Sequence, residues 1–122
     1  LGAGTSNSNL KNNYGKVRVQ MNDESFNTNR IHLGCFIGDF VKTSIGTKIN
    51  TGSVYGSGSM IFSKDFPSKN IPILTWYTDN GMSKVSIDKF ILNCQRMKKR
   101  RGVDFDTVEE QFYRNLFLNV EK

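Results

Sequence analysis

The sequence has little of what most enzymes use for catalysis. It contains a single histidine, His32, and two cysteines, Cys35 and Cys94. No Ser-His-Asp set can be drawn from the spacing, and no Gly-rich phosphate loop with its lysine is present. The cysteines stand far apart without neighbouring histidines, so no metal site is expected. Both thiols are predicted to be buried small apolar groups, which fits a reducing cytoplasm.

Long apolar runs are also absent. No stretch of about eighteen apolar residues could form a membrane-spanning helix, so no membrane partner is expected. The cytoplasmic location is expected from the free thiols alone. The net charge is +6, and five of the positive charges cluster within residues 96–101. This cluster indicates either a phosphate or nucleic-acid surface, or cations that offset a helix dipole before Gly102. The run contains no aromatic residue to stack on bases, so nucleic acid is not an expected partner.

What is present is a six-residue repeat. Its first position recurs as Ile31, Ile37, Thr43, Ile49 and Tyr55, with Ile61 opening one more unit. Its fifth position is small or β-branched, as Cys35, Val41, Thr47, Ser53 and Ser59. Its fourth position is Gly34, Gly46, Gly52 and Gly58, with Phe40 as the exception.

This period predicts a parallel β-helix in which the first residue of each unit points inward. The small fifth residue lets the chain bend, and glycine accepts a positive φ at the turn. The alternative is a flexible Gly-rich linker, but a linker would not need an apolar residue in phase with its glycines. The fold class is therefore mainly β, with hexapeptide repeats.

The β-helix coils are predicted to occupy residues 1–81. Residues 1–6 form one hexad, and the Asn-rich segment 7–30 is expected to project from a corner as an inserted loop, with a short strand at 16–21. Segment 63–81 carries two prolines, which disfavour ladder pairing, so it is expected to cover the side or open end of the coil. Because these hexads make fewer than two coils, the chain is expected to borrow surface from partner subunits or to belong to a longer coil.

Residues 82–122 are predicted to form two helices. The first has apolar residues at helical spacing, at Ile87, Phe90, Ile91, Cys94 and Met97. The second is expected to start near Asp106, with Glu109 completing a capping box. Its predicted buried side consists of Val108, Phe112 and Leu116, together with Tyr113.

Few residues are candidates for chemistry or binding. His32 is the natural general base, although a plain surface histidine is the alternative. Asn9, Asn12 and Asn13 could bind sugar hydroxyls or could form turns through their own side chains.

Two lysines complete the candidate substrate-binding set. Lys42 and Lys48 take the sixth position of successive hexads and are expected to line up along one outer edge. There they would meet a phosphate or remain solvated.

Three segments together carry a family resemblance: SNLKNNYG (8–15), GDFVKTSIGTKINTGSVYG (38–56) and FPSKNIPILTW (66–76). They resemble a divergent bacterial branch of sugar-1-phosphate nucleotidyltransferase-like proteins. The hexads LGAGTS and IGDFVK are also similar to those of the bifunctional N-acetylglucosamine-1-phosphate uridyltransferase/glucosamine-1-phosphate acetyltransferases. The resemblance implies a left-handed parallel β-helix, a homotrimer, and an upstream nucleotidyltransferase domain that these 122 residues do not contain.

The resemblance implies a role in sugar-nucleotide metabolism, as an oligomerisation module of a transferase. The alternative is an acyltransferase that uses acetyl-CoA on an amino sugar phosphate. Asn9 matches a family asparagine and His32 falls near a family lysine that contacts the sugar phosphate, but Leu10 replaces a tyrosine and Ile45 replaces a serine near acetyl-CoA. These departures favour the assembly role, with this segment alone inactive.

Overall fold

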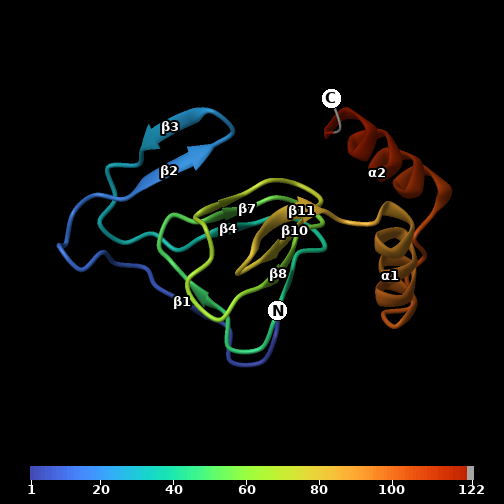
Figure 1. The fold of residues 1–122 in the computed structure, drawn as a ribbon, viewed down its shortest axis with the longest axis horizontal. Coiled ribbons are helices and arrows are strands. Elements are labelled where there is room, and N and C mark those ends of the chain that lie inside the picture. Colours follow the sequence, from blue (N-terminus) through green and yellow to red (C-terminus); the bar gives the residue numbers. More distant parts are fainter. Residues whose placement is uncertain (121–122) are drawn as a thin grey trace. The chain divides into compact units, whose positions relative to one another are not determined.

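The computed structural model describes residues 1–120, which divide into two compact units. The first runs from Leu1 to Ser83 and the second starts at Lys84, close to the boundary expected from the sequence. The first unit consists of short strands, most of them in parallel sheets, and the second of two helices (Figure 1). The chain is therefore mainly β with a C-terminal helical segment, as predicted.

Short strands recur along the first unit. They are β1 (Ser6–Asn7), β4 (Phe36–Ile37), β5 (Lys42–Thr43), β6 (Lys48–Ile49), β7 (Val54–Tyr55), β8 (Met60–Phe62), β9 (Asn70–Ile71), β10 (Thr75–Thr78) and β11 (Gly81–Lys84). From β4 to β8, each strand begins six residues after the one before it. The hexad is thus the spacing of the strands, as the sequence predicts.

The strands form three sheets, in the orders β4-β7-β9, β11-β10-β8-β5 and β1-β6. The pairs β4-β7, β7-β9, β10-β8, β8-β5 and β1-β6 are parallel. Phe36 is in register with Val54, so the chain returns to the same sheet after 18 residues, or three hexads. The next return, from Val54 to Asn70, takes 16 residues. Successive hexads therefore lie in different sheets, and residues about 18 apart become neighbours.

The core follows the predicted positions of the repeat. Ile49, Tyr55 and Ile61 are at most 2% exposed, and they pack with Val41 and Ile71. The inward prediction fails at Ile31 and Ile37, which are 46% and 38% exposed. Ile37 lies in β4, the outermost strand of its sheet, so no further strand covers it on that side.

The core also encloses hydroxyl groups. The oxygens of Ser53, Tyr55 and Ser59 are buried without a well-formed hydrogen bond among the described residues. Burial raises the pKa of the Tyr55 phenol to about 12, and the nearby Ser53 hydroxyl opposes that rise. Tyr55 is therefore held in its neutral form.

The fourth position of the repeat adopts a left-handed turn conformation in every unit except that of Gly34. Gly46, Gly52 and Gly58 have φ of +70°, +75° and +74°, and Phe40 has φ of +59° in the same position. Phe40 therefore follows the turn geometry of the glycines, although a side chain makes that conformation unfavourable.

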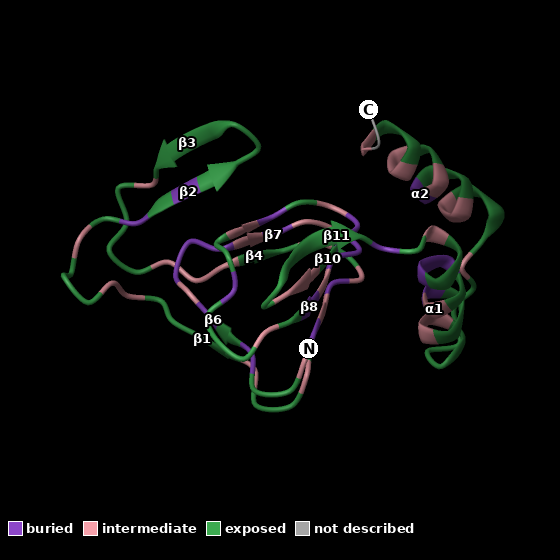
Figure 2. Cartoon of the chain, viewed as in Figure 1, coloured by how far each residue is buried: buried purple, intermediate pink, exposed green. Residues whose placement is uncertain are grey.

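The inserted segment contains an antiparallel hairpin of β2 (Arg18–Met21) and β3 (Glu24–Asn27). The strand predicted at 16–21 is confirmed, and its partner lies in residues expected to be part of the inserted loop without a strand of their own. β3 is exposed throughout, whereas β2 carries a buried residue (Figure 2). Val17 at the base of the hairpin is fully buried, and its backbone N–H donates to the Arg30 carbonyl at 2.8 Å.

The covering role predicted for segment 63–81 is wrong, because this segment extends the parallel sheets. β9 pairs with β7 and β10 pairs with β8. Pro67 and Pro72 lie just outside β9, where neither interrupts a ladder. The Asp79 carboxylate fixes the start of the segment, accepting hydrogen bonds from the Ser63 hydroxyl at 2.8 Å and the Lys64 N–H at 3.2 Å.

The second unit contains α1 (Ile87–Lys99) and α2 (Thr107–Val120), in agreement with the predicted helices. Asp106 Oδ1 accepts a hydrogen bond from the Glu109 N–H at 2.8 Å, as half of a capping box. The Glu109 carboxylate binds the Lys98 ammonium group at 2.6 Å instead of completing the box. Among the described residues, neither helix is long and apolar enough to cross a membrane.

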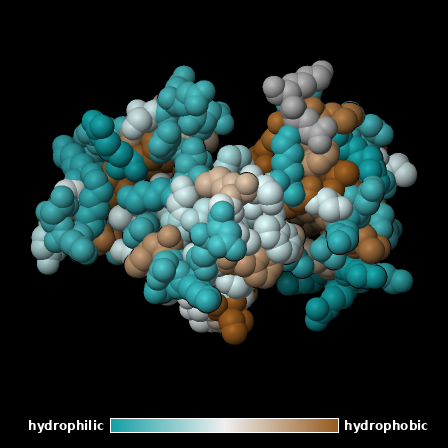
Figure 3. Space-filling view, viewed as in Figure 1, coloured by the Kyte–Doolittle hydropathy of each residue, from teal (hydrophilic) through white to brown (hydrophobic). Residues whose placement is uncertain are grey.

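The predicted buried side of α2 is confirmed at Tyr113 and wrong at Val108 and Phe112, while Leu116 is half-buried. Tyr113 is buried and packs edge-on against Phe90, with ring centroids 5.1 Å apart. Val108 and Phe112 are instead 74% and 59% exposed, because the helix is rotated to place Tyr113 inward. Hydrophobic side chains are accordingly visible on the helical unit (Figure 3).

Candidate functional site: a polar cavity between three segments

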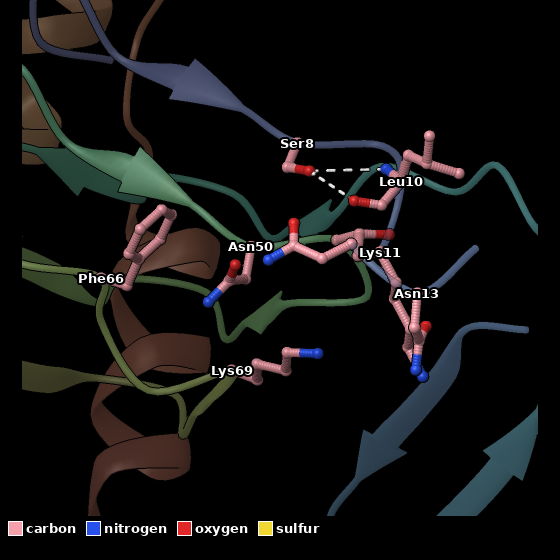
Figure 4. A pocket seen from close by; sticks show the side chains of 9 residues that line it. Ser8, Leu10, Lys11, Asn13, Asn50, Phe66 and Lys69 are labelled. Carbon is pink, nitrogen blue, oxygen red and sulfur yellow. Dashed lines mark hydrogen bonds between the residues drawn. The ribbon is translucent and has the colours of Figure 1, made fainter. Parts of the chain in front are cut away.

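A cavity of about 470 Å³ lies where three segments of the first unit meet (Figure 4). Its lining consists of Ser8, Leu10, Lys11, Asn12, Asn13, Asn50, Thr51, Phe66 and Lys69. The segments are residues 8–13 after β1, residues 50–51 after β6, and residues 66–69 before β9. We call this site the polar cavity.

Parallel pairing brings the segments together. Asn7 is in register with Ile49, and the Ser8 N–H donates to the Ile49 carbonyl at 2.9 Å, so the chain leaves β1 beside the end of β6. The Lys48 ammonium group lies over the Phe66 ring, 5.5 Å from its centroid. The cavity is thus built from one corner of successive layers, not from residues that are close in sequence.

The loop from residue 8 to residue 15 is ordered by its own hydrogen bonds. Ser8 Oγ donates to the Leu10 carbonyl at 3.0 Å, and the Tyr14 N–H donates to the Lys11 carbonyl at 3.0 Å. Asn13 Oδ1 accepts from the Gly15 N–H at 2.9 Å, which is the turn-forming role that was the alternative for this residue. The loop wall is therefore held in place before any ligand binds.

Several polar side chains of the lining are available to a ligand. Within residues 1–120, the side chains of Lys11, Asn12, Asn50 and Lys69 make no hydrogen bond or ion pair with the protein. In contrast, Thr51 is buried and donates its hydroxyl hydrogen to the Leu33 carbonyl. The unpartnered groups are two ammonium ions and two amides.

The charge of the lining has one sign. Among residues 1–120, Lys11 and Lys69 are the only charged members of the lining, so the site favours an anion. Phe66 is 52% exposed and supplies an apolar wall, which the Lys48 side chain contacts from outside the lining. The combination is suited to a ligand that carries negative charge, hydroxyl groups and some apolar surface.

The asparagines predicted to bind substrate divide into two groups. Asn12 and Asn13 line the polar cavity. Asn9 lies outside the lining, and its carbonyl accepts a hydrogen bond from the Leu33 N–H at 3.0 Å.

The expectation that Lys42 and Lys48 follow one outer edge is wrong. Lys42 lies in β5 opposite Met60, whereas Lys48 lies in β6 opposite Ser6, in another sheet. Successive hexads occupy different sheets, so residues six apart do not line up. Lys48 reaches the site only through its contact with Phe66.

His32 does not lie in the lining of the polar cavity. It is exposed in the connection between β3 and β4, and within residues 1–120 its ring makes no hydrogen bond or ion pair. Ile45, which the resemblance places where a serine lies near acetyl-CoA, is 79% exposed. No second functional group of the described residues stands beside His32 to orient it as a base.

Lys69, Asn50 and Phe66 were not identified from the sequence as site residues. The periodic return of the chain to the same sheet was a partial signal, but the return that brings in Lys69, from Val54 to Asn70, takes 16 residues in place of three whole hexads. Among the described residues, no group of three or more His, Cys, Asp or Glu side chains could hold a metal ion. Comparison with known proteins gives no match, either to a protein-family model or to a curated protein.

Proposed function

We propose that this chain is a left-handed parallel β-helix domain that binds a sugar phosphate and serves as an assembly module in sugar-nucleotide metabolism. The 18-residue return through sheets of two-residue strands supports a hexapeptide-type coil. The left-handedness of the coil is inferred from the family resemblance. The two free cysteines are compatible with a reducing compartment.

The observation that carries the binding proposal is the unpartnered polar lining of the cavity. Lys11 and Lys69 would donate charge-assisted hydrogen bonds to phosphate oxygens. The amides of Asn12 and Asn50 both donate and accept, which matches sugar hydroxyls. A volume of about 470 Å³ falls in the range of small-molecule sites.

The assembly role is supported by large apolar side chains at the surface of the first unit, in β4 and in the turn between β5 and β6. Phe36 and Ile45 are 51% and 79% exposed. Contact with further copies in a homotrimer would remove this surface from water. Acyl transfer with acetyl-CoA is not part of the proposal, because no observation places an activated base beside the polar cavity.

Titration calorimetry with glucosamine 1-phosphate tests the binding proposal. We expect saturable binding at low salt, and a loss of about tenfold or more in affinity for Lys69→Ala and for Lys11→Ala, because a charged hydrogen bond contributes about 1.5–3 kcal/mol. Lys89→Ala is the control, since Lys89 is an exposed lysine of α1 outside the lining. Glucosamine alone should bind much more weakly than the phosphate.

Three results would contradict this proposal. One is the absence of saturable binding to the wild-type chain. Another is equal loss of affinity in Lys69→Ala and Lys89→Ala. The third is saturable binding of acetyl-CoA in competition with the sugar phosphate, which would support the acyltransferase alternative.

A further inference from the structure

Two surfaces of opposite charge lie in different units, and neither belongs to the polar cavity. The first is the tip of the β2–β3 hairpin, where Met21, Asn22, Asp23, Glu24 and Phe26 line a hollow of about 380 Å³. We call it the hairpin tip. The second is the basic end of α1, which consists of Arg96, Lys99, Arg100 and Arg101.

The hairpin tip combines acidic and apolar side chains. Met21 is in register with Glu24, and Val19 with Phe26, so these four share one face of the hairpin. Val19 is buried at the base, whereas Met21 and Phe26 are 50% and 47% exposed. Within residues 1–120, Asp23 and Glu24 have no ion-pair partner.

The hairpin is an anchored arm. The Thr28 hydroxyl donates to the Val17 carbonyl at 2.7 Å, and the Val17 N–H donates to the Arg30 carbonyl at 2.8 Å. The base is fixed in this way, while the tip has polar and apolar groups that no described residue covers. An arm of this kind is suited to reach another molecule.

The basic end of α1 carries more charge than its helix needs. Lys98 is neutralised by Glu109, but the four residues of the basic end have no ion-pair partner among the described residues. Cations in the last helical turn stabilise a helix, yet four unpaired cations within six residues also repel one another. Val103, just beyond the end of this helix, is 51% exposed. The surface is therefore basic with an apolar neighbour.

We propose that the hairpin tip of one copy docks on the basic end of α1 in a second copy. Asp23 and Glu24 complement the four cations, and Met21 and Phe26 meet an apolar side chain at Val103. Two different patches of the chain meet in such a contact, which closes into a ring when the rotation between copies permits. The inference rests on the assembly part of the proposed function and supplies the contact for a ring of three.

Molecular mass measured against concentration tests this contact in the full chain. The wild type is expected to reach three times the chain mass of 13.8 kDa and to dissociate as salt rises. The paired reversals Asp23→Lys with Glu24→Lys should weaken association about tenfold or more, and so should Arg100→Glu with Arg101→Glu. An equimolar mixture of the two reversed proteins should associate better than either alone, because both kinds of mixed contact pair opposite charges. A mixed ring of three restores two of its three contacts, so the association should be weaker than that of the wild type. Asp39→Lys is the control, because Asp39 is exposed and outside the hairpin tip.

The proposal is overturned if either paired reversal leaves association unchanged, or if the mixture associates no better than each reversed protein alone. A wild-type chain that stays monomeric also overturns it, as does binding of single-stranded DNA to the basic end without loss of the trimer. Met21→Ser with Phe26→Ser should weaken association independently of charge. Glucosamine 1-phosphate should bind the Asp23→Lys/Glu24→Lys protein with wild-type affinity, so failure of the interface and failure of the polar cavity are distinguishable.

Discussion

Replacing Gly52 by alanine tests how the inserted hairpin is joined to the parallel sheets. Gly52 has φ of +75°, and a Cβ there would lie 2.7 Å from the Arg18 carbonyl oxygen and 2.7 Å from Val17 Cγ1. Gly46 is the matched control, because it has φ of +70° but nothing within 4 Å of its added Cβ. The two substitutions share backbone strain and differ only in the close approach of the hairpin base.

The expected magnitudes follow from this difference. An L-residue in the left-handed region loses about 1–2 kcal/mol, and alanine regains about 0.4–1 kcal/mol by restricting the unfolded chain. Gly46→Ala should therefore lower the free energy of unfolding by about 1 kcal/mol. Gly52→Ala should lower it by a further ~1–3 kcal/mol, because overpacking against a backbone carbonyl cannot be relieved by a side-chain rotation.

Urea unfolding followed by tryptophan fluorescence measures this difference. Trp76 is the single tryptophan and lies in β10, so its signal reports on the first unit. Both variants should keep the wild-type dependence on urea, which shows that the same surface is exposed on unfolding. Equal midpoints for the two alanine variants would refute the packing of the hairpin base on the corner at Gly52.

Three further predictions concern the core, its pH dependence and the segment after β8. Ile61→Ala should lower the free energy of unfolding by about 2–5 kcal/mol, because Ile61 is fully buried, and an unchanged urea midpoint would remove it from the core. The folded state holds Tyr55 neutral up to about pH 12, whereas the unfolded phenol ionises near pH 10, so stability should fall between these values by at most about 3 kcal/mol. Tyr55→Phe should remove that part of the alkaline slope in urea titrations, and an identical slope would contradict the assignment. Hydrogen bonds lower the pKa of Asp79, so its stabilising effect is present above the usual carboxyl pKa and is lost as pH falls below it. Asp79→Asn should speed hydrogen exchange at the Lys64 amide near neutral pH, and unchanged exchange would show that Asp79 does not hold this turn.

The hexad made the local structure of the first unit predictable. Strand spacing, inward positions such as Ile61 and small buried residues such as Ser59 all follow from side-chain size and period. Phe40 shows the limit of the pattern, because its positive φ is imposed by the neighbouring turns and not by its own preference. The helices were also predictable from their spacing, but the rotation of α2 was not, since Tyr113 and Val108 compete for the inward side and packing against Phe90 decides.

The candidate site was only partly predictable. Asn12 and Asn13 were identified because the asparagine side chain can both form turns and bind sugar hydroxyls. Lys69 and Asn50 were missed, because they become neighbours only through the 18-residue and 16-residue returns of the chain. The 16-residue return could not be foreseen, since the prolines near β9 suggested a break in the sheets.

The most direct test of the polar cavity is nuclear magnetic resonance of the side-chain amides during addition of glucosamine 1-phosphate. The account predicts saturable shifts for the Asn12 and Asn50 amides, and none for Asn9 or the His32 ring. The Lys69→Ala chain should need about tenfold more ligand for the same shifts. Shifts that gather around His32, or no saturable shift at Asn50, would contradict the account.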